Sequence, residues 1–252
     1  MELFTPSIEI LALLFFVAVI AGLIDTLAGG GGLITLPALM MSGVPPLLAL
    51  GTNKLQGSIG TATASIMMFK HKKVHWREVK ILMLIAFLGS LLGTLIVQII
   101  DTNALKLAIP IALTFILLYF ILLPWLSSKN QKKKLSKTQY QSTAIPIIGI
   151  YDGVFGPGAG SFFTLAGVSL RGHELVNSTA IAKTLNFATN VSSLIIFIIM
   201  GNIVWSAGIV MMIGQAFGAW IGSHLLFDIN QQLLRLIVII MCAGMLVKFT
   251  FF

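Results

Sequence analysis

Charged residues are scarce in this 252-residue chain: Asp, Glu, Lys and Arg make up 10% of it, against about 25% in a typical soluble domain. Hydrophobic residues make up 57%, and the mean hydropathy is +1.00. This composition excludes soluble enzymes and soluble nucleic-acid-binding proteins. The single cysteine, Cys242, excludes a disulfide framework and a thiolate metal site. We therefore expect a protein whose main partner is the lipid bilayer, with no nucleic acid, no cofactor and no metal ion.

The apolar residues are arranged in long continuous runs, without the period-2 alternation of a transmembrane barrel. Runs of about 20 residues suit helices that cross a hydrocarbon core of about 30 Å. Inside a bilayer a helix satisfies its own backbone hydrogen bonds. The sequence therefore predicts an all-α polytopic membrane protein with about 8–10 membrane segments. The runs cover residues 8–28, 31–42, 47–69, 81–100, 105–126, 141–155, 159–170, 175–200, 205–227 and 232–252.

The two halves of the chain repeat one another. The segment from Gly22 to Asp25 matches the one from Gly149 to Asp152 at a spacing of 127 residues, and further matches follow at a spacing of 129. We therefore expect a first membrane repeat at residues 1–128, a Lys-rich cytoplasmic linker at 129–140 and a second membrane repeat at 141–252.

The distribution of basic residues predicts how the repeats are oriented. The loop after the third run carries five Lys or Arg residues and the linker carries five more, whereas the loop at 201–204, equivalent to the first of these, carries none. Basic loops remain on the cytoplasmic side of a membrane. The sequence thus predicts two inverted-topology repeats, with both termini extracytoplasmic. The basic residues are Lys70, Lys72, Lys73, Arg77 and Lys80, then Lys129, Lys132, Lys133, Lys134 and Lys137.

Each half contains a glycine-rich break before a short apolar run of about a dozen residues. Glycine lowers helix propensity, so a helix is expected to stop there and expose backbone groups to a solute. Paired broken or re-entrant helices are typical of a transport site. Close helix packing, or a loop at the membrane surface, is the alternative explanation. The glycines are Gly29, Gly30, Gly31 and Gly32 in the first half and Gly156, Gly158 and Gly160 in the second.

An acidic residue precedes each break and a lysine follows it: Asp25 and Lys54 in the first half, Asp152 and Lys183 in the second. Such charges must pair or face a watery cavity. The lysines could bind an anionic substrate. Alternatively, the Asp and Lys of each half could form a structural ion pair, or the Asp could take part in coupling. Neutral polar residues on the same helices favour a small oxyanion over a cation: Thr52, Asn53, Gln56, Asn186 and Asn190. Gln98 and Gln215 could line the path or bond across helices.

The two breaks, together with the segment from Leu50 to Gln56, resemble the TauE/SafE sulfite-exporter family, and the similarity covers nearly the whole chain. The resemblance implies a multi-pass secondary transporter of the bacterial inner membrane that exports small sulfur-containing anions such as sulfite or sulfoacetate. It implies that the glycine breaks, Thr52-Asn53-Lys54, and Lys183 with Asn186 form the substrate site. It leaves the substrate, the direction of transport and the coupling ion open.

Two other functions remain open at this level. An anion channel would use the same lysines and glycines. An intramembrane hydrolase would use Ser161 with His173 or His224, but Ser161 lacks the flanking glycine of a nucleophile turn. An ATP-driven mechanism within this chain is disfavoured because the sequence contains no phosphate-binding Gly-x-x-x-x-Gly-Lys motif. We expect a transporter and not an enzyme; the sequence does not set the oligomeric state.

Overall fold

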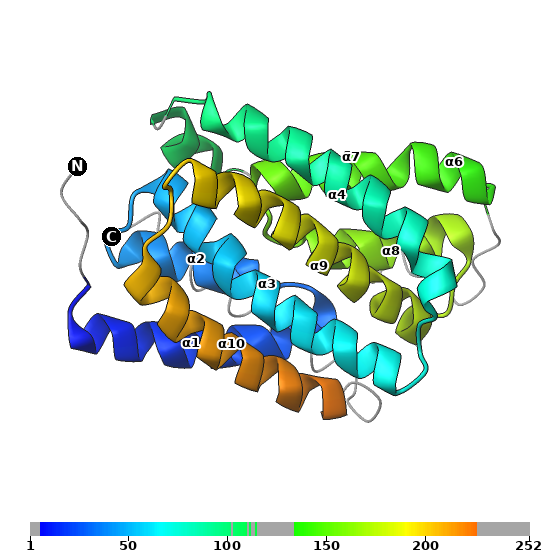
Figure 1. Ribbon diagram of the computed structural model, residues 1–252, viewed down its shortest axis with the longest axis horizontal. Coiled ribbons are helices and arrows are strands. Elements are labelled where there is room, and N and C mark those ends of the chain that lie inside the picture. The colour runs from blue at the N-terminus through cyan, green and yellow to red at the C-terminus, as the bar shows by residue number, and fades with distance from the viewer. Residues whose placement is uncertain (1–5, 102, 110, 112–113, 115–133, 226–252) are drawn as a thin grey trace.

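The structure is a computed structural model, and it describes residues 6–101, 103–109, 111, 114 and 134–225. The described part is helical and contains no strand. Its long helices lie roughly side by side in one elongated bundle (Figure 1). The helices are α1 (Ile8–Ala28), α2 (Gly32–Met41), α3 (Pro46–Lys70), α4 (Trp76–Gln98), α6 (Lys137–Ser142), α7 (Ala144–Val154), α8 (Ala159–Arg171), α9 (Leu175–Ile199) and α10 (Trp205–Leu225).

Local sequence signals explain where several helices begin and end. The Ser7 side chain caps the start of α1, and Gly29 ends that helix in the left-handed conformation, at φ 82°. Pro46 occupies the first position of α3, where its missing N–H costs no hydrogen bond. Ser136 and Gln139 form a reciprocal capping box at the start of α6. These boundaries therefore follow from capping chemistry as well as from hydropathy.

The predicted apolar runs agree with the helices, with two corrections. The run at 141–155 contains α7 and only the end of α6, which begins before it, at Lys137, and the run at 81–100 begins earlier, at Trp76. Arg77 and Lys80 therefore lie in the first turns of α4 and not in the preceding loop. Long basic side chains can extend from a helix end to the polar interface, so hydropathy placed this boundary too late. The run at 232–252 and most of 105–126 lie outside the described residues.

Within the described residues, four helices are long and apolar enough to cross a membrane: α1, α4, α9 and α10. Helix α3 is as long as α9, with 25 residues, and both helices are rich in polar side chains. Helix α3 is the less apolar of the two because it contains three glycines and fewer large aliphatic side chains. Most polar side chains of α3 are buried among the other helices. Polar residues in a membrane bundle usually face its interior, so this burial places α3 inside the bundle.

The two halves do not pack as separate bodies. Helix α1 packs most extensively on α10 of the second half, and α7 packs on α4 of the first half. Glycines make both contacts close. A Cβ atom at Gly218 would meet the Val19 carbonyl oxygen, and one at Gly93 would meet that of Ile150. Two glycines four residues apart form a small-xxx-small pattern on each helix, Gly89 and Gly93 on α4 and Gly218 and Gly222 on α10, and these patterns therefore serve helix packing. These reciprocal contacts agree with the equivalence of the two halves.

The bundle has two ends, which we define by their connections. The basic end comprises the connection at 71–75, the chain from 134 to 137 and the loop at 172–174. Arg171 Nη1 donates to the Leu135 carbonyl oxygen at 2.8 Å there. The opposite end comprises the connections at 42–45, 99–101 and 200–204. Asn202 Nδ2 donates to Gln98 Oε1 at 2.7 Å there, which joins the end of α4 to the start of α10.

The short helices α2 and α8 each return to the end from which the preceding helix came (Figure 1). Helix α2 has 10 residues and is about 15 Å long. It runs from the middle of the bundle to the opposite end, where α1 also begins. Helix α8 runs from the middle to the basic end, where the Lys134 N–H donates to the Leu170 carbonyl oxygen at 3.0 Å. Each pair is therefore a hairpin whose tip lies inside the bundle.

Candidate functional site

The tips of the two hairpins meet in the middle of the bundle. A Cβ atom at Gly29 would collide with the backbone of Gly160 and Ser161, and one at Gly160 would lie 3.0 Å from the Gly29 Cα atom. The Ser161 hydroxyl donates to the Ala28 carbonyl oxygen, which adds a direct hydrogen bond across the crossing. The glycine-rich breaks therefore let two backbones cross in contact where the chain leaves its regular helices.

A small cavity lies beside this crossing, with room for about one or two water molecules. Asn53 of α3 and the residues three, four and eight positions after it line one side of the cavity. Helix α9 contributes two asparagines that are four positions apart. Such spacings place side chains on one face of a helix. The lining residues are Asp25, Gly29, Gly32, Asn53, Gln56, Gly57, Thr61, Gly156, Gly158, Asn186, Asn190 and Gln215.

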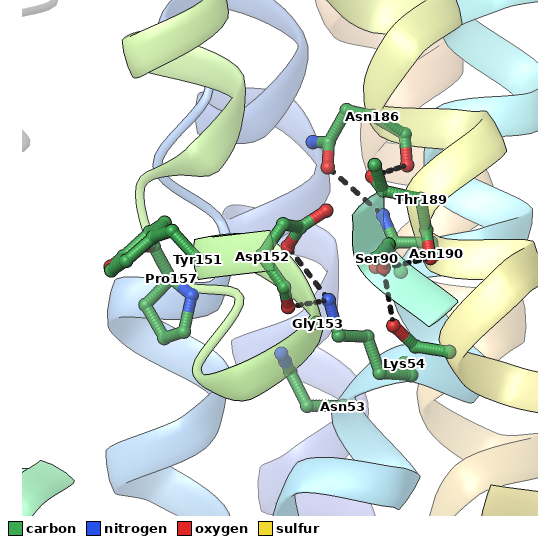
Figure 2. A network of polar contacts seen from close by, with 12 residues as sticks. Asn53, Lys54, Ser90, Tyr151, Asp152, Gly153, Pro157, Asn186, Thr189 and Asn190 are labelled. Carbon is green, nitrogen blue, oxygen red and sulfur yellow. Dashed lines mark hydrogen bonds and ion pairs between the residues drawn. The ribbon is translucent and has the colours of Figure 1, made fainter. Parts of the chain in front are cut away.

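Lys54 joins α3 to the end of α7 (Figure 2). Its Nζ donates to Asp152 Oδ1 at 2.7 Å and to the Asp152 carbonyl oxygen at 2.5 Å. Both side chains are 1% exposed. The carbonyl belongs to the last turn of α7, where helix carbonyls lack an intrahelical partner and carry partial negative charge. The ammonium therefore neutralises a carboxylate and a helix end together.

Lys183 makes the equivalent contacts with α1. Its Nζ donates to the Asp25 carbonyl oxygen and lies 3.3 Å from Asp25 Oδ2. The sequence-based pairing of Asp25 with Lys54 within one half is thus wrong, because each lysine reaches the acidic residue of the other half. The physical reason is the exchange of helices between the halves, which places the end of α1 against α9. Two ion pairs cross between the halves and leave these four side chains with no net charge.

The amide groups of Asn53 and Asn186 have defined orientations. Asn53 Oδ1 accepts hydrogen bonds from the Thr35 hydroxyl at 2.6 Å and from Gln56 Nε2 at 2.8 Å. Its Nδ2 therefore points the other way, toward the segment between Asp152 and Pro157 (Figure 2). Asn186 Oδ1 accepts from Asn190 Nδ2 at 3.2 Å in the same manner. Both asparagines thus direct N–H donors toward the hairpin crossing.

Several residues predicted for the substrate site lie beside the cavity without lining it. Lys54, Lys183 and Asp152 belong to the ion pairs. The Gly31 N–H donates to Asp25 Oδ1 at 3.1 Å. Thr52 faces the opposite end, where its hydroxyl accepts from the Val204 N–H at 3.0 Å. Gly30 and Gly160 are buried at the hairpin tips. The lysines therefore support the walls of the site and do not line it.

Three lining residues were missed or left undecided from the sequence: Gly57, Thr61 and Gln215. Gly57 and Thr61 continue the face of α3 that begins at Asn53, so the helical spacing of the polar residues could have found them. The sequence signal for Gln215 is weaker: it is a long amide side chain in the middle of a largely apolar helix. It is 2% exposed.

The residues considered for a hydrolase are not brought together. Ser161 lies in the first turn of α8, at the hairpin crossing, and His173 follows the other end of that helix. His224 Nδ1 bonds to the carbonyl oxygen of Trp220 within α10, at 2.8 Å. Since a nucleophile and its base must be within hydrogen-bond reach, this geometry gives the hydrolase hypothesis no support.

Comparison with known proteins gives a consistent result. Residues 14–249 match the family model described as "Sulfite exporter TauE/SafE". The chain is 42% identical over 245 residues to a "Probable membrane transporter protein" of Haemophilus influenzae, covering 97% of this chain and 96% of the relative. It is 42% identical over 247 residues to the "Probable membrane transporter protein YfcA" of Escherichia coli K12, covering 98% and 92%. It is 23% identical over 255 residues to "Probable membrane transporter protein YunE" of Bacillus subtilis, covering 91% and 92%.

No solved structure matches the chain significantly. The family match spans almost the entire sequence, including both glycine breaks and all four residues of the ion pairs. The relatives that match over nearly their full length are named as membrane transporters. The chain therefore belongs to the sulfite exporter TauE/SafE family.

Proposed function

We propose that this protein is a secondary transporter of small oxyanions, of which sulfite and organosulfonates such as sulfoacetate are the leading candidates, and that it exports them. The single observation that carries the anion preference is the donor orientation of the two asparagines at the cavity. Asn53 and Asn186 direct Nδ2 groups toward the hairpin crossing because their oxygens already accept hydrogen bonds. N–H donors recognise oxyanions and not metal cations.

The short helices strengthen this electrostatic preference. Both α2 and α8 begin at the hairpin crossing, with Gly32 and Gly158 on the cavity wall. The first turn of a helix presents free N–H groups and partial positive charge. Two N-termini and two amide donors therefore converge at a place where the nearby formal charges cancel in pairs. The positive potential for the anion comes in this proposal from dipoles, with the lysines acting through the ion pairs.

The size of the cavity bears on the mechanism. Room for about one or two water molecules is too little for an anion of several heavy atoms. The described arrangement therefore corresponds in this proposal to a contracted state, and substrate binding requires the two hairpin tips to separate. Opening toward each end of the bundle in turn would give alternating access, the mechanism of carriers with paired broken helices. A channel would need a continuous path instead. Saturation and dependence on a counter-ion in liposome flux assays distinguish the carrier from the channel.

Changing a donor to an acceptor tests the anion site. Asn53→Asp keeps the side-chain shape and both internal hydrogen bonds, but it replaces Nδ2 with a carboxylate oxygen. We expect the affinity for sulfite or a sulfonate to fall about 10- to 100-fold, since a hydrogen bond to a charged group contributes about 1.5–3 kcal/mol. The measurement is ligand-dependent thermal stabilisation of purified protein across a panel of oxyanions and sulfonates.

Asn202→Asp is the matched control, because Asn202 lies at the opposite end and bonds to Gln98. It adds the same charge away from the cavity and should leave anion affinity within about twofold. Equal affinities for wild type and Asn53→Asp would contradict an anion site at the hairpin crossing.

We further propose that the basic end faces the cytoplasm and that both chain termini are extracytoplasmic. The described basic residues at this end come from three separate parts of the chain, and the loop at 201–204 on the opposite end has no charge. Positively charged connections are retained inside. The described residues of this end are Lys70, Lys72, Lys73, Arg77, Lys80, Lys134, Lys137 and Arg171.

Cysteine labelling tests this orientation. In a Cys242→Ser background, a cysteine introduced by Asn202→Cys should react with a membrane-impermeant maleimide added to intact cells. A cysteine introduced by Lys72→Cys should react only after the membrane is permeabilised, because the two positions lie at opposite ends of the bundle. The reverse pattern would invert the proposed orientation and with it the assignment of the basic end.

A further inference from the structure

Gln215 of α10 is a buried polar side chain that takes no part in the two ion pairs. It is 2% exposed and lines the cavity, yet its Oε1 has no hydrogen-bond partner among the described residues. A buried acceptor without a partner is destabilising unless a ligand or water supplies the donor. The oxygen itself is covered in the contracted cavity, and because its side chain lies on the cavity wall, a ligand that enters when the hairpin tips separate can supply that donor.

The neighbouring backbone is shaped around this side chain. A Cβ atom at Gly60 would collide with Gln215 Cγ and lie 2.9 Å from its Nε2. A Cβ atom at Gly22 would collide with the carbonyl oxygen of Gln215. Glycines on α1 and α3 thus allow α10 to approach closely and leave space for the amide beside the cavity. The equivalent of Gln215 in the first half, 129 residues earlier, is Ala86, so this amide has no counterpart in the repeat.

A second free acceptor lies on the same cavity. Gln56 donates through Nε2 to Thr35 Oγ1 and Asn53 Oδ1, and its Oε1 has no partner among the described residues. Gln56 is 1% exposed. The cavity therefore carries two kinds of groups: N–H donors directed to the hairpin crossing and free amide oxygens on α3 and α10.

We propose that Gln215, assisted by Gln56, determines the substrate specificity of the site by accepting a hydrogen bond from the substrate. The proposal rests on the anion transport function proposed above. Among the candidate organosulfonates, the preferred substrate then has an anionic head for the donors and a hydroxyl or ammonium group at its other end for the amide oxygens, which disfavours sulfoacetate with its second anionic group. Asn53 and Gly60 are seven residues apart on α3, about 10 Å along the helix axis, so a ligand that contacts both sides is extended.

Three sulfonates of equal length test this specificity. Propanesulfonate, 2-hydroxyethanesulfonate and 2-aminoethanesulfonate share the head group and differ only in the terminal methyl, hydroxyl or ammonium. We expect wild-type protein to bind the hydroxyl or the ammonium compound at least tenfold more tightly than the methyl compound, because the analogue without a donor leaves the buried oxygens unpaired. The measurement is the dissociation constant from calorimetric titration of purified protein, and it needs no variant.

Gln215→Leu removes the acceptor at similar size. The preference for the donor-bearing sulfonate should fall to within about threefold, while the affinity for propanesulfonate changes little, because the head-group donors remain. Gln98→Leu is the matched control: it replaces a glutamine at the opposite end of the bundle and should preserve the wild-type preference.

Each result leads to a definite conclusion. If wild type binds all three sulfonates equally, the specificity role of Gln215 is wrong and the anion site stands. If neither these compounds nor sulfite binds, the proposed transport function is itself wrong. Sodium chloride could instead stabilise the wild type against heat where choline chloride does not. If Gln215→Leu abolishes this effect, the amide oxygens hold a cation and the inference is overturned.

Discussion

Lys54→Gln is expected to cost the protein about 3–5 kcal/mol of folding stability, because it leaves the Asp152 carboxylate buried without its countercharge. The lost hydrogen bond to the Asp152 carbonyl oxygen also frees the end of α7. Thermal unfolding of the purified protein in detergent measures the loss of stability, and liposome flux of a sulfonate measures activity. Both should fall sharply.

Two double variants identify the true partner of Lys54. Lys54→Gln with Asp152→Asn removes both charges of one pair and should recover much of the lost stability. Lys54→Gln with Asp25→Asn leaves Asp152 and Lys183 each without a partner and should be worse than either single change. Such non-additivity is the signature of direct contact. Recovery in the second double variant and not in the first would show that the pairs form within each half.

The same variants separate the structural role of the pairs from a transport role. If the charge-neutral Lys54 and Asp152 double variant is folded and transports normally, the pair only supports the hairpin. If it is folded and binds the anion but does not transport, the pair takes part in the conformational change or in coupling. The two crossed pairs connect the hairpins to α3 and α9. A movement of one hairpin relative to the other would therefore change the contacts of these pairs.

Gly29→Ala is expected to produce the second large effect. Gly29 has φ 82° and its Cβ position collides with the backbone of the other hairpin. The left-handed conformation costs a residue with a Cβ about 1–2 kcal/mol, and crowding in a packed interior adds about 1–3 kcal/mol. We expect lower thermal stability and loss of transport, because the crossing of the hairpins must open to admit the Cβ atom. Thermal unfolding and liposome flux are again the measurements.

Gly201→Ala is the matched control for this change. Gly201 also has positive φ, 70°, but no atom lies within 4 Å of its Cβ position. The loss of stability in Gly201→Ala measures the conformational cost alone. The additional loss in Gly29→Ala measures the cost of the backbone contact at the crossing. Equal effects of the two substitutions would show that the crossing tolerates a methyl group and that the close approach is unimportant.

Bulky changes at the hairpin tips address transport more directly. Gly31→Leu and Gly158→Leu place large side chains beside Asp25 and in the cavity wall, respectively. We expect both to reach the membrane and to be defective in transport, with Gly158→Leu losing anion binding as well. Both should also be less stable to heat, because Gly158 has φ 81° and a Cβ atom at Gly31 would lie 2.7 Å from Asp25 Cβ. Membrane fractionation and flux are the measurements. Wild-type flux in a normally inserted variant would argue against the hairpin tips as the transport site.

The amino-acid sequence determined the helices and their breaks. Hydropathy set the limits of α1 and α9 almost to the residue, because an apolar run is a local property. Glycine at 29 and 156 marked the places where helices stop, because positive φ is a local requirement as well. The match of Asp25 to Asp152 and of Lys54 to Lys183 predicts the register of two repeats.

Only the tertiary structure decided which of these residues meet. In the chain, Lys54 lies 29 residues after Asp25 and 98 before Asp152, and sequence proximity favoured the partner that the fold does not use. The orientation of the Asn53 amide depends on a hydrogen bond from Thr35 of α2. The position of Gln215 on the cavity wall depends on glycines of α1 and α3, which let α10 approach closely. These contacts arise because the halves exchange helices, and a small-xxx-small pattern marks a close-packing face without identifying the helix that packs on it. Local chemistry therefore set the elements, whereas long-range packing set the charge pairs and the lining of the site.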